Sequence, residues 1–157
     1  MDKHELTELL NDVAAGRVSA DNAALRLKIQ PFMEIGDYAK VDMHRGVRQG
    51  VPEVIFSAGK TKEHILGIAQ TMLENGQETV LITRLSEEAA EYVGRALALD
   101  YNKLAMTGVI GKKPEPTGKG RIVVATGGTS DISVAEEAAV TAETLGNEVV
   151  RLYDVGV

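Results

Sequence analysis

Short apolar runs that alternate with helical segments dominate the chain from residue 53 onward. The runs at 53–56 and 79–82 are typical of strands, and helical periodicity follows each of them, over 61–74 and 86–98. The same strand, helix and strand order recurs over 121–126, 132–145 and 148–153. Strands separated by a helix pair in parallel, because the helix carries the chain back along the sheet. The sequence therefore predicts an α/β fold built from βαβ units and small parallel sheets.

The segments ahead of these units predict a helical hairpin. Apolar residues recur at helical spacing over 6–13, and Gly16 follows where a helix ends. A second helix begins after Ser19 and ends before Pro31, because the residue before a proline avoids helical geometry. We interpret the pair as a packing or oligomerisation element. Two further short segments, a polar loop or hairpin and a hairpin around Thr107-Gly108, are predicted over 36–50 and 103–110.

The stretch 111–120 is the predicted domain boundary. Three glycines and two prolines in ten positions sustain neither helical nor strand periodicity. An amino-terminal α/β domain then occupies 1–110, and a second α/β domain starts within 121–157. The strand at 121–126 is continuously apolar, so we expect it to be buried on both faces. Because a two-stranded parallel unit has no second layer, we expect an incomplete domain and a chain that is the amino-terminal portion of a longer polypeptide.

The composition argues against a nucleic-acid partner and excludes chemistry that depends on cysteine. Acidic residues outnumber basic ones by 23 to 17, for a net charge of −6, and the chain has two Phe, four Tyr and no Trp. We expect no nucleic-acid partner, because the chain has neither the positive charge nor the stacking rings that such proteins use. The chain has no cysteine, which excludes disulfides, zinc-thiolate sites, iron–sulfur clusters and a cysteine nucleophile.

Membrane insertion and metal binding are not expected either. No apolar run approaches the roughly 18 residues of a membrane span. The amino terminus reads MDKHE and lacks the basic head and apolar stretch of a signal peptide, so we expect a cytoplasmic protein. His4, His44 and His64 fall in different predicted elements without metal-ligand spacing, and no metal site is predicted.

The strongest candidate site is the turn at 127–131, which follows the strand at 121–126 and opens a helix. Ligands of open α/β sheets bind at this carboxyl edge of the strands. Gly127 and Gly128 allow the backbone to approach a ligand closely. The hydroxyls of Thr129 and Ser130 can donate to phosphate or ribose oxygens, and Asp131 can accept from a ribose hydroxyl.

A helix cap is the competing interpretation of this turn. Ser130, Asp131 or Ser133 would supply the cap, and Ser133 and Glu136 have the spacing of a capping box. Asp154 ends the next strand on the same edge, where its carboxylate would share acid–base work with Asp131. The alternative for Asp154 is an aspartate that starts a turn.

A second candidate is Gly59-Lys60-Thr61, which stands between a strand and a helix as the end of a P-loop does. The pattern is incomplete, because the first glycine of that motif would fall at Val54. What remains is a contact of Lys60 and the helix-start amides with one phosphate or carboxylate. The alternative is a glycine turn with a helix cap.

Several segments resemble one family. The segment KVDMHRGVRQGVPEVIF at 40–56, running on to Gly59-Lys60-Thr61, resembles the amino-terminal domain of the LarB family, the pyridinium-3,5-biscarboxylic acid mononucleotide synthases of nickel-pincer nucleotide biosynthesis. The stretch ATGGTSD at 125–131, the helix at 134–149 and the segment RLYDVGV at 151–157 look like the same family. The carboxyl-terminal part is also similar to the aminoimidazole ribonucleotide carboxylases. Their G-S-x-S-D turn resembles residues 127–131 of this chain, which has Gly128 in place of the first Ser.

The resemblance implies that residues 121–157 begin a doubly wound domain like that of the aminoimidazole ribonucleotide carboxylases. It implies carboxylation of the pyridinium ring of nicotinic acid adenine dinucleotide, with hydrolysis of the phosphoanhydride to release AMP. Carbon dioxide or bicarbonate would be the co-substrate, and magnesium is a candidate cofactor. A homo-oligomer is expected. Thr129, Ser130 and Asp131 match the family's nucleotide-holding turn, and Asp154 matches a residue near the same pocket.

The chain departs from the family in one respect that matters for catalysis. In the family, a cysteine thiolate is thought to add to the pyridinium ring and make it electron-rich enough to attack carbon dioxide. Because this chain has no cysteine, we expect no turnover by the chain on its own. The alternatives are a non-catalytic nucleotide-binding module, an oligomerisation module, or an aminoimidazole ribonucleotide mutase or carboxylase.

Overall fold

The computed structural model describes residues 3–27, 32–35, 39–42 and 52–156. The predicted helical hairpin is confirmed as α1 (Lys3–Ala14) and α2 (Ala20–Leu27). The Ser19 Oγ accepts a hydrogen bond from the Asn22 amide at 3.2 Å, and Gly16 adopts the left-handed φ of 71° that glycine favours after a helix. An antiparallel pair follows, β1 (Phe32–Ile35) and β2 (Ala39–Asp42), and the rest of the predicted segment 36–50 lies outside the described residues.

The central sheet has the strand order β3-β4-β6-β5, with bounds Val54–Phe56, Thr79–Thr83, Thr107–Gly111 and Leu99–Asn102. Strands β3 and β4 are parallel, as predicted, but β6 is antiparallel to both of its neighbours. The mixed α/β class is confirmed, and the sheet is mixed where a parallel one was expected. Thr107 and Gly108 are part of β6, and the turn of this hairpin lies at 103–106, where Met106 has a φ of 50°.

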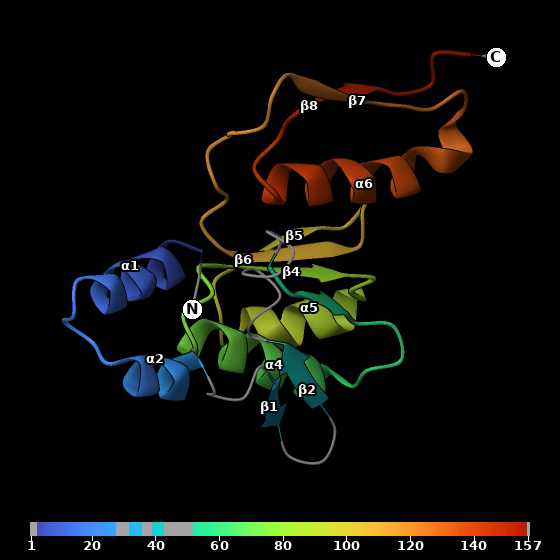
Figure 1. Cartoon of the computed structure of the whole chain (residues 1–157). Coiled ribbons are helices and arrows are strands. Elements are labelled where there is room, and N and C mark those ends of the chain that lie inside the picture. Colours follow the sequence, from blue (N-terminus) through green and yellow to red (C-terminus); the bar gives the residue numbers. More distant parts are fainter. Residues whose placement is uncertain (1–2, 28–31, 36–38, 43–51, 157) are drawn as a thin grey trace.

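Helices α4 (Lys62–Glu74) and α5 (Glu87–Gly94) cover one face of this sheet (Figure 1). Thr61 and Ser86 cap them, each with a side-chain oxygen that accepts from the amide three residues on. Helix α5 ends before the predicted residue 98, because the chain must turn back to begin β5 at Leu99. The β3-α4-β4 unit is the parallel βαβ unit that the sequence predicts.

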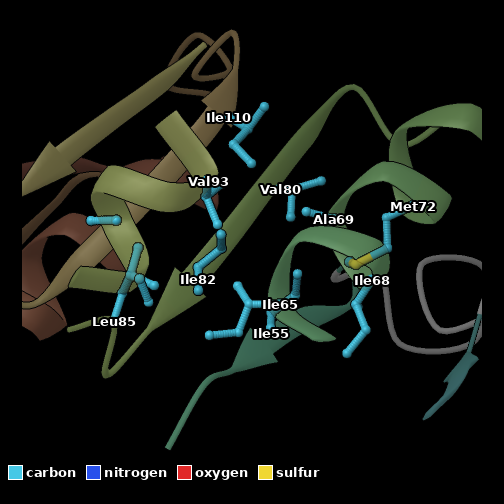
Figure 2. Close-up of a cluster of buried hydrophobic side chains, with 12 residues drawn as sticks. Ile55, Ile65, Ile68, Ala69, Met72, Val80, Ile82, Leu85, Val93 and Ile110 are labelled. Atoms are coloured by element: carbon cyan, nitrogen blue, oxygen red, sulfur yellow. The ribbon is translucent and has the colours of Figure 1, made fainter. Parts of the chain in front are cut away.

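The main core lies between this sheet and the two helices (Figure 2). Its largest fully buried side chains include Ile65 and Met72 of α4, Ile82 of β4 and Val93 of α5. Alternate residues of a strand point to opposite faces, so Leu81 of β4 contributes to a second cluster on the other face. That second cluster is formed by Leu81, Ala105, Val109 and Val140.

Helix α6 (Ile132–Thr144) supplies Val140 and lies between the central sheet and the parallel pair β7 (Arg121–Ala125) and β8 (Glu148–Leu152) (Figure 1). The predicted second βαβ unit is therefore confirmed. Its strand at 121–126 is not buried on both faces, because α6 covers only one face of the pair. Val123 on the other face is 57% exposed and Leu152 is 46% exposed.

Within the described ranges, no helix combines the length and apolar character that crossing a membrane requires.

Candidate functional site

The carboxyl ends of β7 and β8 are joined by hydrogen bonds that continue past both strands. Thr126 follows β7 and is 6% exposed; its amide donates to the Leu152 carbonyl at 3.0 Å, and its Oγ1 accepts from the Asp154 amide at 3.0 Å. The Val155 amide donates to the Thr126 carbonyl at 3.1 Å, and the Gly156 amide donates to the Gly127 carbonyl at 2.9 Å. The segments after β7 and β8 therefore form one continuous edge.

The turn after Gly127 leaves polar side chains exposed on this edge. A short 3-10 turn, η1 (Thr129–Asp131), leads into α6, and all three of its residues are exposed. Asp131 is the N-cap residue of α6, yet its side chain makes no capping hydrogen bond. The helix-cap interpretation of Asp131 therefore finds no support in the geometry.

Gly128 has an extended backbone, with φ −135° and ψ 178°, which any residue can adopt. A Cβ at this position would meet no atom within 4 Å. Neither backbone conformation nor packing within the described part of the chain requires glycine here. An open space beside a backbone without a side chain is what the close approach of a ligand needs.

Asp154 lies at the same edge, as the sequence predicts from its place after β8. Its φ of 58° is in the left-handed region, which aspartate tolerates better than most residues. Its side chain is exposed, and its amide is held by Thr126. The structure thus brings Asp154 next to the segment that carries Gly127 and Gly128. The left-handed φ of Asp154 also agrees with the alternative interpretation, an aspartate that starts a turn.

A network of charged and polar side chains connects α6 with the end of β8, next to this edge. Glu136 of α6, 8% exposed, accepts hydrogen bonds from Arg151 Nε at 2.9 Å and from the Tyr153 hydroxyl at 2.7 Å. Asn102 of β5 donates to the same carboxylate at 3.0 Å. Arg151 also forms an ion pair with Glu143, which lies seven residues after Glu136 in α6. The network ties β8 and α6 to the hairpin of the central sheet.

The ionisation of this network follows from its contacts. Burial alone would raise the pKa of Glu136, but the hydrogen bonds from Arg151 and Tyr153 outweigh it and hold that pKa below its ordinary value. Burial, with the Glu136 carboxylate beside it, raises the pKa of Tyr153 to about 12. Hydrogen bonds to Glu143 and Glu136 raise the pKa of Arg151. Glu136 is thus a carboxylate and Tyr153 a neutral hydroxyl at neutral pH.

Sequence reasoning missed this network and placed Glu136 only in the competing interpretation, as part of a capping box with Ser133. That interpretation does not hold for Glu136, because its carboxylate is bound by Arg151, Tyr153 and Asn102. The signal was available: Glu136 and Glu143 lie seven residues apart on one face of α6. Arg151 of β8 and Tyr153, the residue that follows the strand, are two positions apart, the spacing of side chains on one face of an extended segment.

Lys60 lies at the turn between β3 and α4, in the other βαβ unit. Gly59 has a φ of 77°, and Thr61 caps α4, so the glycine turn with a helix cap is present as the alternative interpretation states. Lys60 lines a shallow hollow of about 280 Å³ together with Lys62 and Glu88, which form an ion pair at 2.6 Å. An anion contact of Lys60 stays a prediction.

The predicted absence of a metal site concerns His4, His44 and His64, of which His44 lies outside the described residues. Among the residues that the structure describes, no group of three or more His, Cys, Asp or Glu is placed to hold a metal ion.

The fold and the edge together define a class: a mixed α/β protein with polar residues at the carboxyl ends of neighbouring parallel strands. The sequence profile of the LarB/PurE-like N-terminal domain matches residues 32–112, which is just over half of the chain. The chain therefore belongs to the LarB/PurE-like family.

A relative in Methanocaldococcus jannaschii, itself an uncharacterized protein, is 35% identical over 158 aligned positions. The alignment covers 97% of this chain and 62% of the relative, so the chain spans less than two thirds of that protein's length. This alignment, unlike the family profile, also includes the β7-α6-β8 unit.

Proposed function

We propose that the chain is part of a carboxylase of the LarB type and binds nicotinic acid adenine dinucleotide at the β7–β8 edge. The proposal rests on family membership and on the resemblance of residues 125–131 and 151–157 to LarB enzymes. One structural observation carries it furthest: the turn leaves the Asp131 carboxylate exposed and without a capping bond, beside a glycine whose Cβ position is open. Both features support the proposal that this turn binds a ligand.

Different residues of this edge contact different parts of the nucleotide. Gly127 and Gly128 let a phosphate or ribose approach the backbone, and Thr129 and Ser130 offer hydroxyl donors. Asp131 accepts from the ribose hydroxyls. Asp154 stands across the edge, where it assists as an acceptor or takes up a proton, and the buried Glu136 network holds both sides in place.

The chain's own residues do not supply the step that activates the ring. A cationic pyridinium does not attack carbon dioxide until an electron pair has been added to it, and the thiolate used for this in the family has no counterpart here. The chain therefore holds the dinucleotide and leaves the covalent step to a cysteine that this sequence does not contain.

The first expected result concerns turnover. With nicotinic acid adenine dinucleotide and labelled bicarbonate, the 157-residue chain should release no AMP and fix no label. A LarB enzyme that carries its cysteine serves as the positive control. Label incorporation by this chain would show that another group activates the ring.

The second expected result concerns binding. Loss of a charged hydrogen-bond partner costs roughly 1.5–3 kcal/mol, so Asp131→Ala should weaken dinucleotide affinity by about one to two orders of magnitude in calorimetry. Gly128→Ala should also weaken binding and leave thermal melting unchanged, because its Cβ meets no protein atom. Glu74→Ala removes another exposed carboxylate, at the end of α4, and is the control that should change neither quantity.

The outcomes separate the proposal from its rivals. If Asp131→Ala and Ser130→Ala melt early but bind normally, the turn is structural and the site lies elsewhere. Preferential binding of aminoimidazole ribonucleotide over the dinucleotide would favour the mutase or carboxylase of purine synthesis. Binding of neither, together with concentration-dependent assembly, would favour an oligomerisation module.

A further inference from the structure

A second hollow lies between the β5–β6 hairpin and α6. Its volume is about 320 Å³, at the lower end of the range for small-molecule sites. Its walls come from both parts of the chain: Asn102 and Thr107 belong to the hairpin, Lys113 follows it, and Val140 belongs to α6. The β7–β8 edge contributes none of the residues that line this hollow, so the two sites are separate.

The strand register explains why polar groups gather here. Asn102 pairs with Thr107 and Asp100 pairs with Val109 across the hairpin, and paired residues of neighbouring strands share a face. These four face α6, while Leu99 and Tyr101 of β5 pack against the main core. Asn102 is already bound to Glu136 and to the Ala105 amide, so it shapes the wall.

Thr107 is the exceptional member of this lining. The residue is 1% exposed, and its Oγ1 is buried with no hydrogen-bond partner. Buried hydroxyl groups of folded proteins are satisfied by protein, water or ligand in the large majority of cases. An unsatisfied hydroxyl in the lining of a hollow therefore points to a polar occupant.

Two lysines at the rim indicate the charge of that occupant. Lys113 pairs with Asp100 at 3.4 Å and Lys103 pairs with Glu87 at 2.8 Å. The side chains of both lysines are exposed, 41% and 74%, so these ion pairs are weak and can be exchanged for another anion. The three charged residues of the lining, Asp100, Lys103 and Lys113, carry a net positive charge in a chain whose net charge is −6.

The lining also limits the shape of the occupant. Tyr101 packs against the main core, and its hydroxyl donates to the Leu85 carbonyl at 3.0 Å, so its ring is committed to the other face. Tyr101 is the only aromatic residue among those that line the hollow, so this lining offers no free ring for a nucleobase to stack on. Val109 and Val140 supply the small apolar part of the lining.

We infer that this hollow binds a phosphate monoester of a small hydroxylated compound, of the size of a sugar phosphate. Lys103 and Lys113 hold the phosphate, and Asp100 and Thr107 bond to the hydroxyl groups. Because the ligand contacts the hairpin, Lys113 and α6 together, its binding stabilises the packing of α6 on the central sheet.

The test uses the whole chain and three probes: ribose 5-phosphate, ribose and inorganic phosphate. Ribose 5-phosphate should bind saturably in calorimetry and raise the melting temperature. Ribose should not bind, and phosphate alone should bind more weakly, because each lacks half of the contacts. The amide resonances of residues 100–109 and 113 should shift on binding. Absence of saturable binding up to about 10 mM would overturn the inference, since that corresponds to less than roughly 3 kcal/mol of binding free energy.

Matched variants locate the site. Lys113→Ala should weaken binding of ribose 5-phosphate by about tenfold. Lys112→Ala removes the same charge one residue away, outside the hollow, and should change affinity little. Thr107→Val keeps the shape without the hydroxyl, so it should weaken binding by about fivefold without lowering the melting temperature.

Two further results would overturn the inference. The first is an equal loss of affinity in Lys112→Ala and Lys113→Ala, which would mean that the phosphate responds to surface charge alone. The second is loss of ribose 5-phosphate binding in Asp131→Ala with no change in Thr107→Val, which would place the probe at the β7–β8 edge. Weakened dinucleotide binding in Asp131→Ala, with ribose 5-phosphate binding intact, is the expected result, because the two sites share no residue.

Discussion

Replacement of Glu136 by glutamine should lower the free energy of unfolding by about 3 kcal/mol, because it removes the charge that compensates buried donors. The Glu136 side chain is 11% exposed and accepts from Arg151, Tyr153 and Asn102. The new amide would turn an N–H group toward one of these donors, which would lose its acceptor at a largely buried position. Chemical denaturation measures the loss.

Glu137→Gln is the matched control. Glu137 is the next residue of α6 and pairs with Arg84 at 3.1 Å, but the Arg84 side chain is 50% exposed. An ion pair open to solvent on one side contributes about 0–1 kcal/mol, so this variant should lose correspondingly little. Equal losses in the two variants would contradict the structural role of the Glu136 network.

The pH dependence of stability gives the same network a second test. The folded-state pKa of Glu136 lies below its ordinary value of 4.5, so the unfolded chain binds more protons than the folded one between these two values. The stabilisation by Glu136 is therefore complete above the unfolded pKa and is lost as the pH falls through the folded pKa. The wild type and Glu136→Gln should differ most at neutral pH, and their stabilities should converge in acid.

Replacement of Gly111 by alanine is expected to have an effect of similar size, for a steric reason. Gly111 ends β6 with a φ of 90°, and a Cβ there would lie 2.0 Å from the Glu78 carbonyl oxygen. Backbone atoms cannot move aside without disturbing the pairing of β4 with β6. The left-handed φ adds roughly 1–2 kcal/mol and the clash adds about 1–3 kcal/mol, so we expect a total loss of about 2–5 kcal/mol in denaturation experiments.

Gly76→Ala provides the control for backbone strain. Gly76 has nearly the same φ, 89°, but a Cβ there would meet nothing within 4 Å. It should lose only the conformational part, about 1–2 kcal/mol. Similar losses at both positions would mean that the strand ends of β4 and β6 separate easily and that the clash has no consequence.

Glu136→Gln and Gly111→Ala should also differ in their effects on the candidate site. Arg151 and Tyr153 flank the end of β8, directly before Asp154, so loss of Glu136 should loosen the β7–β8 edge and weaken dinucleotide binding as well as stability. Gly111 lies in the central sheet and has no hydrogen bond to that edge, so its replacement should leave the affinity of the remaining folded protein nearly unchanged.

The sequence by itself determined the features that depend on a few neighbouring residues. Thr61 and Ser86 cap their helices because a hydroxyl can reach an amide three residues on. The parallel pairing of β3 with β4 and of β7 with β8 follows from the single helix between them. The placement of Gly127, Gly128 and Asp154 at one edge follows in turn, because parallel strands end on the same side of a sheet.

Tertiary structure decided the features that depend on contacts between distant segments. Strand β6 inserts antiparallel between β4 and β5, and no local pattern specifies which edge of a sheet a hairpin joins. Val123 is exposed because only one face of β7 meets α6, although its apolar character suggested burial on both faces. Glu136 has the spacing of a capping box, but its carboxylate bonds to Arg151, fifteen residues away. Local preferences set the conformation of each segment, whereas its partners depend on which surfaces the whole chain buries together.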